Sequence, residues 1–239
     1  MPSTEALQEQ IDANPTVVAL LFAKSWFGFD LDDTLHEFRK ASAHASQSVF
    51  EKILKSRHPS LKDRERIHRW ENVRRLPQGA VSYLLEAYGL KPSTELLSQL
   101  LLTYRSSLRA ALTLKPGARQ LLERLKALGK KVIVVTEGPK DAQEWTVAEL
   151  SLEPLIDILV TTNEVGMSKV DGLFPAVLHK YNIAPGDMVY VGDNAQRDVV
   201  PARAAGIDTV LYNEKGDLFN DPHHLKVNSL SKLEHLLSC

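Results

Sequence analysis

Residues 116–136 read PGARQLLERLKALGKKVIVVT, and this stretch decides the fold. Leucines recur at helical spacing over 118–128, Gly129 stands where that helix would end, and the segment 131–136 that follows has the apolar run 132–135 between Lys131 and Thr136. The pattern predicts a helix, a glycine stop and a buried strand. A strand that is apolar along its whole length is typical of a parallel sheet covered by helices on both faces.

The same alternation continues towards the C-terminus. It predicts helices over 141–150, 174–181 and 195–205, and strands over 156–161, 188–192 and 209–212. Another short apolar strand is predicted directly before Asp30. Strands that alternate with helices in this way predict an α/β fold, with a doubly wound, Rossmann-like parallel sheet.

The segment between the first strand and residue 113 differs from the rest, because it has helical spacing and no convincing strand. It predicts an inserted all-helical cap domain. The expected domains are the α/β core, residues 1–35 and 113–239, and the cap, residues 36–112. Since the insert leaves and re-enters the core beside the first strand's end, we expect it to lie over the carboxyl ends of the strands.

Composition limits the classes of partner and compartment. The net charge of −1 gives no global reason to expect nucleic acid or a membrane surface as a partner. The only cysteine is Cys239, so no intramolecular disulfide can form, and the apolar run at 17–23 is too short to span a bilayer. We therefore expect a cytoplasmic protein, and the sequence leaves monomer and homodimer open.

The first strand runs into Asp30-Leu31-Asp32-Asp33-Thr34. On a strand or its extended exit, alternation places Asp30 and Asp32 on one face, with Leu31 pointing back into the core. Two neighbouring carboxylates repel unless a cation or a shared proton lies between them. This cluster therefore predicts a metal-assisted site, with Asp33 as a turn residue.

Other chemically active residues follow later strands or occupy the loop between them. In chain order these are Thr136-Glu137-Gly138, Ser168-Lys169, Gly192-Asp193-Asn194 and Asp198. Ligands of open α/β sheets bind beyond the carboxyl ends of the strands, which is where these groups are expected to gather. They are groups that suit a phosphate or a metal ion.

In this order, the motifs resemble those of phosphatases of the haloacid dehalogenase (HAD) superfamily, and the resemblance covers roughly residues 24–213. The position of the insert is similar to that of subfamily I, which carries a helical cap of the C1 type. One departure is that many relatives have proline after the motif lysine, whereas Val170 follows Lys169 here.

The resemblance implies a mechanism at the first motif. Asp30 would be the nucleophile that forms an aspartyl-phosphate, and Asp32 would be the general acid and base. Thr34 would hydrogen-bond Asp32. A Mg²⁺ ion would lie between Asp30, the backbone carbonyl of Asp32 and Asp193, where it would offset the clustered negative charge.

The resemblance also assigns the remaining motifs. The Thr136 hydroxyl and the backbone amides of Glu137 and Gly138 would bind the phosphoryl oxygens, and Lys169 would neutralise the charge that develops on them. The set expected to bind substrate is Thr34, Glu137 and Gly138. Around these, Asn194 and Asp198 would orient Lys169 or a metal-bound water.

The activity that follows is hydrolysis of a small phosphorylated metabolite by a Mg²⁺-dependent phosphomonoesterase. Residues 136–139 look like those of relatives that act on sugar phosphates, acylneuraminate phosphates or nucleoside monophosphates. Alternatives are a phosphomutase, a 2-haloacid dehalogenase, and a non-catalytic or diphosphate-processing protein. The basic segment 57–75 could steer an anionic substrate, or could be a solvated helix face.

Overall fold

The computed structural model describes residues 15–55, 93–214 and 225–238. The chain divides into two compact units, one made of residues 1–36 and 114–239 and the other of residues 37–113. The basic segment 57–75 lies outside the described residues. Among the residues that are described, no helix combines the length and apolar character needed to cross a membrane.

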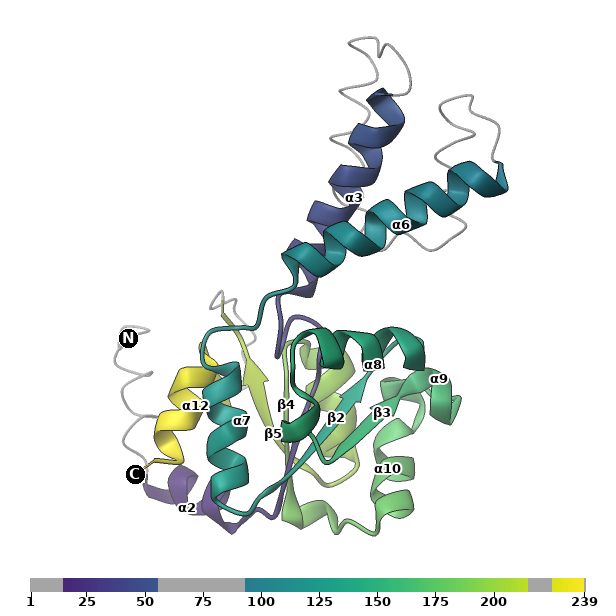
Figure 1. Cartoon of the computed structure of the whole chain (residues 1–239). Coiled ribbons are helices and arrows are strands. Elements are labelled where there is room, and N and C mark those ends of the chain that lie inside the picture. The colour runs from purple at the N-terminus through teal and green to yellow at the C-terminus, as the bar shows by residue number, and fades with distance from the viewer. Residues whose placement is uncertain (1–14, 56–92, 215–224, 239) are drawn as a thin grey trace, which may run out of the picture. The chain divides into compact units, whose positions relative to one another are not determined.

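The first unit is built on a six-stranded sheet in the order β3-β2-β1-β4-β5-β6, with every neighbouring pair parallel (Figure 1). The strands are β1 (Trp26–Phe29), β2 (Lys131–Thr136), β3 (Ile158–Thr161), β4 (Met188–Gly192), β5 (Asp208–Tyr212) and β6 (Leu225–Val227). The first strand, β1, lies in the middle of the sheet. Strands β2 and β3 extend the sheet on one side of it, and β4, β5 and β6 extend it on the other. The predicted doubly wound fold is confirmed, with β6 as an additional edge strand.

Helices precede, connect and follow the strands in the first unit. They are α2 (Pro15–Ala23), α7 (Ala118–Ala127), α8 (Lys140–Glu149), α9 (Thr162–Val165), α10 (Leu173–Tyr181), α11 (Val200–Ala204) and α12 (Leu230–Leu236). The helix predicted over 195–205 begins differently, because η4 (Ala195–Val199) is a π-helical turn and α11 follows it. π-Helical turns of this kind are frequent at functional sites.

The core has an apolar layer on each face of the sheet. On one face, Ile133 and Val135 of β2 join Met188 and Tyr190 of β4 in a buried cluster with residues of α10 and α11. Alternation turns Val132 and the other buried β2 side chains to the opposite face. Figure 1 shows α7 and α12 on that side of the sheet.

The described part of the second unit consists of α3 (Phe38–Lys55) and α6 (Thr94–Ala111). The two helices pack through Val49, Ile53 and Leu100, which are buried. A hydrogen bond of 3.1 Å between Ser42 Oγ and Tyr104 Oη adds a polar contact to the same interface. These residues are helical, as predicted for the inserted cap.

Asp157 connects the turn before β3 to the beginning of β2. Its carboxylate accepts hydrogen bonds of 2.8 Å from the Val132 amide, 2.8 Å from Lys126 Nζ and 3.2 Å from Lys131 Nζ. Burial acts to raise the pKa of Asp157, but these donors outweigh it and lower the pKa below its ordinary value of 3.8. The ionised carboxylate therefore stabilises the folded state.

We predict that Asp157→Asn lowers the free energy of unfolding at pH 7 by roughly 1 kcal/mol, because the charge-assisted bonds are lost. Folding lowers the pKa, so this stabilisation is present above about pH 4 and disappears as the pH falls through the lowered pKa. Urea unfolding at neutral and acidic pH measures the effect. Asp187→Asn is the control, since Asp187 is exposed. An equal loss of stability at both pH values contradicts the prediction.

Candidate active site

The candidate site lies where the three central strands end. Asp30 directly follows β1, and its amide continues the strand pairing by donating to Val191 O at 2.9 Å. Thr136 is the last residue of β2, and Asp193 directly follows β4. Because β1 lies between β2 and β4, the first, second and fourth predicted motifs meet at one edge of the sheet.

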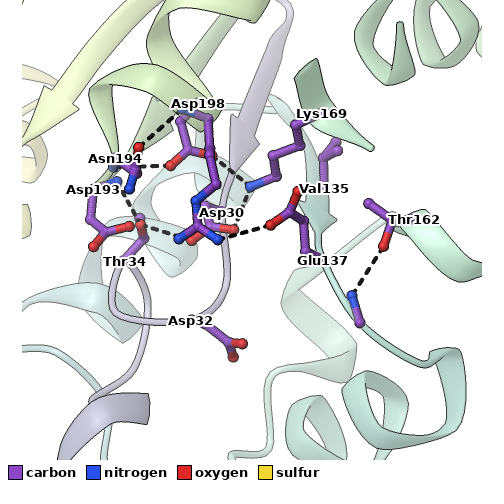
Figure 2. Close-up of polar contacts among 12 residues, drawn as sticks. Asp30, Asp32, Thr34, Val135, Glu137, Thr162, Lys169, Asp193, Asn194 and Asp198 are labelled. Atoms are coloured by element: carbon purple, nitrogen blue, oxygen red, sulfur yellow. Dashed lines mark hydrogen bonds and ion pairs between the residues drawn. The ribbon is translucent and has the colours of Figure 1, made fainter. Parts of the chain in front are cut away.

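Lys169 joins two of these motifs through a buried ion-pair network (Figure 2). It begins the short 3₁₀ turn η2 (Lys169–Asp171), and its Nζ lies 2.6 Å from Asp30 Oδ1 and 2.6 Å from Asp198 Oδ1. All three side chains are buried. Charge-assisted hydrogen bonds of this length are strong when they are shielded from water. The ammonium therefore fixes the two carboxylates relative to each other.

Asp198 is held from its other side as well. Its Oδ2 accepts a 3.0 Å hydrogen bond from the Asn194 amide, and Tyr190 Oη lies 3.4 Å from its Oδ1. The Tyr190 hydroxyl donates to Val135 O at 2.9 Å, which ties β4 to β2. Tyr190 is a buried residue in the middle of a strand, so the sequence offered no signal for this supporting role.

The electrostatics of Asp30 and Lys169 follow from this burial. Loss of hydration raises the pKa of Asp30 well above its ordinary value, and the facing Lys169 ammonium opposes that rise. Burial alone would lower the pKa of Lys169, but the carboxylates of Asp30 and Asp198 raise it well above its ordinary value. Lys169 therefore stays protonated and supplies a permanent positive charge beside Asp30.

Thr34 contacts a different aspartate from the one predicted. Its hydroxyl donates to Asp30 Oδ2 at 3.3 Å, and its oxygen accepts a 3.0 Å hydrogen bond from the Asp193 amide. A hydroxyl has one proton, and here it is directed to Asp30 and not to Asp32. Thr34 thus links the first motif to the fourth.

The side chains of Asp30 and Asp32 do not project together, which corrects the expectation from strand alternation. Figure 2 shows the Asp32 carboxylate pointing away from Asp30. Its Oδ1 lies 3.0 Å from Nε2 of the fully buried His36. The physical reason is that β1 ends at Phe29, so strand alternation does not extend to Asp32, and the turn that follows, with a positive φ of 65° at Asp33, brings His36 back beside Asp32.

The second motif provides an unsatisfied hydroxyl. Thr136 Oγ1 is buried and has no hydrogen-bond partner among the described residues. Burying a hydroxyl without a hydrogen-bond partner destabilises the folded state, unless a bound ligand supplies the missing hydrogen bond. The Gly138 amide, which was predicted to bind phosphoryl oxygens, instead donates to Thr162 Oγ1 at 3.1 Å. The Glu137 carboxylate binds the guanidinium of Arg197 at 2.9 Å, a contact that the sequence did not predict.

Carboxylate oxygens of Asp30, Asp193 and Asp198 lie within 4.8 Å of one another. Lys169 contributes one positive charge against these three carboxylates, which leaves two negative charges when all are ionised. A hard divalent cation fits both that charge and the oxygen donors. Asp198 was expected only to orient neighbouring groups, and its bonds to Lys169 and Asn194 already engage both of its oxygens.

Known proteins resemble this chain in sequence and structure. Glyceraldehyde 3-phosphate phosphatase from Methanocaldococcus jannaschii is 28% identical over 86% of this chain and 93% of its own length. (S)-2-Haloacid dehalogenase 4A from Burkholderia cepacia is 26% identical, covering 72% of this chain and 74% of the relative. YfnB, a HAD-type hydrolase from Bacillus subtilis in a magnesium-bound crystal structure, superposes with a TM-score of 0.68 at 22% identity, over 90% of this chain and 99% of that one.

The family match covers most of the chain. Residues 25–206 match the haloacid dehalogenase-like hydrolases, and this range includes the inserted segment and all four motifs. The parallel sheet and the aspartates at the ends of its central strands agree with that match. The chain therefore belongs to the haloacid dehalogenase-like hydrolase family.

Proposed function

We propose that the protein is a Mg²⁺-dependent phosphomonoesterase that hydrolyses a small phosphorylated metabolite through an aspartyl-phosphate. The observation that carries this proposal is the buried Asp30 carboxylate, bound at 2.6 Å by Lys169 at the carboxyl end of the central strand. A carboxylate in this position is a suitable nucleophile, and the ammonium beside it can stabilise an anionic transition state.

The first chemical step is in-line attack by an Asp30 oxygen on the phosphorus atom. The bond from phosphorus to the leaving oxygen breaks as the aspartyl-phosphate forms. Lys169 neutralises the charge on the phosphoryl oxygens. The unsatisfied Thr136 hydroxyl supports the same assignment, because a phosphoryl oxygen would accept its proton.

Asp32 protonates the leaving oxygen and then takes a proton from the water that hydrolyses the aspartyl-phosphate. It lies two residues after Asp30, and its carboxylate is more accessible to solvent than that of Asp30, with side-chain exposures of 14% and 9%. Lys169 binds Asp30 and Asp198, whereas the Asp32 carboxylate lies beside the His36 imidazole. Asp32 is therefore the better candidate for exchanging a proton.

A Mg²⁺ ion fits the oxygen donors at the strand ends. Asp30 and Asp193 would hold it, with the backbone carbonyl of Asp32 proposed as a third ligand, and Asp198 remains bonded to Lys169. When bound, the ion would draw negative charge from the phosphoryl group and reduce its repulsion by the carboxylates. The structural neighbour from Bacillus subtilis, which has the same fold and binds magnesium, is consistent with this assignment.

The substrate class we propose is a sugar phosphate or a molecule of similar size. The relative from Methanocaldococcus jannaschii is named for glyceraldehyde 3-phosphate, and it aligns over nearly the whole of both chains. A halide leaving group would need neither a proton donor nor a divalent cation, so the Asp32 and Asp193 positions favour phosphate ester hydrolysis over dehalogenation.

The central prediction is that the purified protein releases phosphate from p-nitrophenyl phosphate only with Mg²⁺. Asp30→Asn should lower kcat by a factor of about 10³ or more, because the nucleophile is removed. Asp33→Asn is the matched control from the same motif, since asparagine tolerates the positive φ at this turn. Circular dichroism verifies that both variants fold. Activity without a divalent cation, or retained by Asp30→Asn, contradicts the proposal.

A second prediction separates the role of Asp32 from that of Asp30. In Asp32→Asn, kcat/KM for an alkyl phosphate should fall by about 10² to 10⁴, because a poor leaving group needs a proton donor. For 2,4-dinitrophenyl phosphate, whose leaving group needs no proton, kcat/KM should fall much less. A loss of the same size for both substrates contradicts a role as general acid.

The contact between Lys169 and Asp198 requires a glycine at the end of β4. A Cβ atom at Gly192 would lie 2.4 Å from Asp198 Cβ and 2.5 Å from its Cγ. Both atoms belong to a buried side chain that is already fixed by Lys169 and Asn194. Even one methyl group at this position would therefore displace Asp198.

We predict that Gly192→Ala lowers the free energy of unfolding by about 1–3 kcal/mol, as overpacking does, and also reduces kcat. Thermal unfolding and phosphate release measure the two effects. The matched control is Gly186→Ala, because a Cβ atom there would meet no atom within 4 Å. If Gly192→Ala behaves like the control, Asp198 is not held as described.

A further inference from the structure

The ion pair between Glu137 and Arg197 joins two loops on either side of the nucleophile candidate. Glu137 directly follows β2, and Arg197 lies in the turn η4 that follows β4. Since β1 lies between these strands, a contact from one loop to the other must cross the carboxyl end of β1, where Asp30 lies. Figure 2 shows the dashed contact from Glu137 beside Asp30.

Exposure separates this pair from the groups below it. The side chains of Lys169 and Asp30 are 3% and 9% exposed, whereas those of Glu137 and Arg197 are 23% and 49% exposed. The pair therefore lies on the solvent side of the buried network. A phosphate ester whose phosphorus reaches Asp30 would extend the rest of its carbon chain towards this outer pair.

The backbone of Arg197 is fixed, but most of its guanidinium is available. Asn194 Oδ1 accepts hydrogen bonds from the amides of Gln196 and Arg197 at 3.1 and 3.0 Å, which anchors the beginning of the turn. Nη1 binds Glu137, while Nε and Nη2 make no hydrogen bond within the part of the chain that the structure describes. A guanidinium held in this way can still donate two parallel hydrogen bonds to an oxyanion.

We propose that Arg197 is a specificity-determining residue that binds a second oxyanion of the substrate, a carboxylate or a second phosphate, beyond the transferred phosphoryl group. Glu137 orients the guanidinium and partly neutralises it, so that it does not compete with Lys169 for the transferred group. The inference rests on the proposed phosphatase activity, because it assumes that the phosphoryl group is bound at Asp30.

The test compares substrates that differ in one group. 3-Phosphoglycerate and glycerol 3-phosphate differ by a carboxylate, and fructose 1,6-bisphosphate and fructose 6-phosphate differ by a phosphate. In at least one pair, the wild-type protein should have the lower KM for the member with the extra anion. In Arg197→Gln, KM for that member should rise at least tenfold more than KM for its partner.

Two further variants sharpen the result. Arg197→Lys should restore only part of the discrimination, because lysine cannot form the paired bonds. Lys140→Gln is the charge control: it removes a half-exposed cation at the beginning of α8, and its KM ratios should equal those of the wild type. If Arg197→Gln changes both members of each pair equally, or changes neither, the inference is wrong.

Failure of the proposed function can be distinguished from failure of this inference. If the wild-type protein releases no phosphate from any substrate, the phosphatase proposal is wrong. In that event, calorimetric titration of 3-phosphoglycerate and glycerol 3-phosphate into the wild-type and Arg197→Gln proteins measures binding without turnover. Affinity that does not depend on Arg197 would overturn the inference as well.

Discussion

The buried ammonium of Lys169 is the interaction on which the rest of the site depends. It binds carboxylates that are 139 and 29 residues away in the sequence, and water has little access to any of the three groups. Removing charges from water costs several kcal/mol for each ion, and this cost is offset only when every partner is in place. Loss of the lysine would leave two carboxylates buried without compensation.

The sheet explains how groups so far apart in the chain meet. Parallel strands place all their carboxyl ends at one edge, and the order β2-β1-β4 puts Asp30 between the second and fourth motifs. The supporting contacts also come from the strands: Tyr190 ties β4 to β2, and Gly192 leaves room for Asp198. The site is therefore rigid because its components are attached to the core of the sheet.

The sequence predicted the parts of the fold that have a strong repeating pattern. Strand 131–136 contains the continuous apolar run 132–135, so its position follows from the local pattern of residues alone. The edge strand β6 was missed because Leu225–Val227 is too short to show a pattern. The bounds of helices such as α7 and α10 were predicted to within one residue, since glycine or a change of polarity marks their ends.

The meeting of the motifs at the strand ends was predictable from the sequence, but the contacts among their side chains were less so. The motif residues stand at strand ends, which sequence patterns locate well. The orientation of the Asp32 side chain could not be predicted, because it depends on a turn with positive φ at Asp33 and on a buried partner, His36. The contact of Arg197 with Glu137 joins side chains 60 residues apart, and no local pattern encodes such a pair.

Burial also divides the site into two parts: the buried Lys169 network, which does not tolerate substitution, and the partly exposed pair of Glu137 and Arg197, which does. Substituting Lys169 or Asp198 would leave a charge buried and unpaired, which threatens the fold as well as the chemistry. Glu137 and Arg197 are partly exposed, and surface substitutions usually change stability by less than about 0.5 kcal/mol. If Arg197 binds substrate as proposed, substrate preference can therefore change at the outer pair while the buried network of Lys169 stays intact.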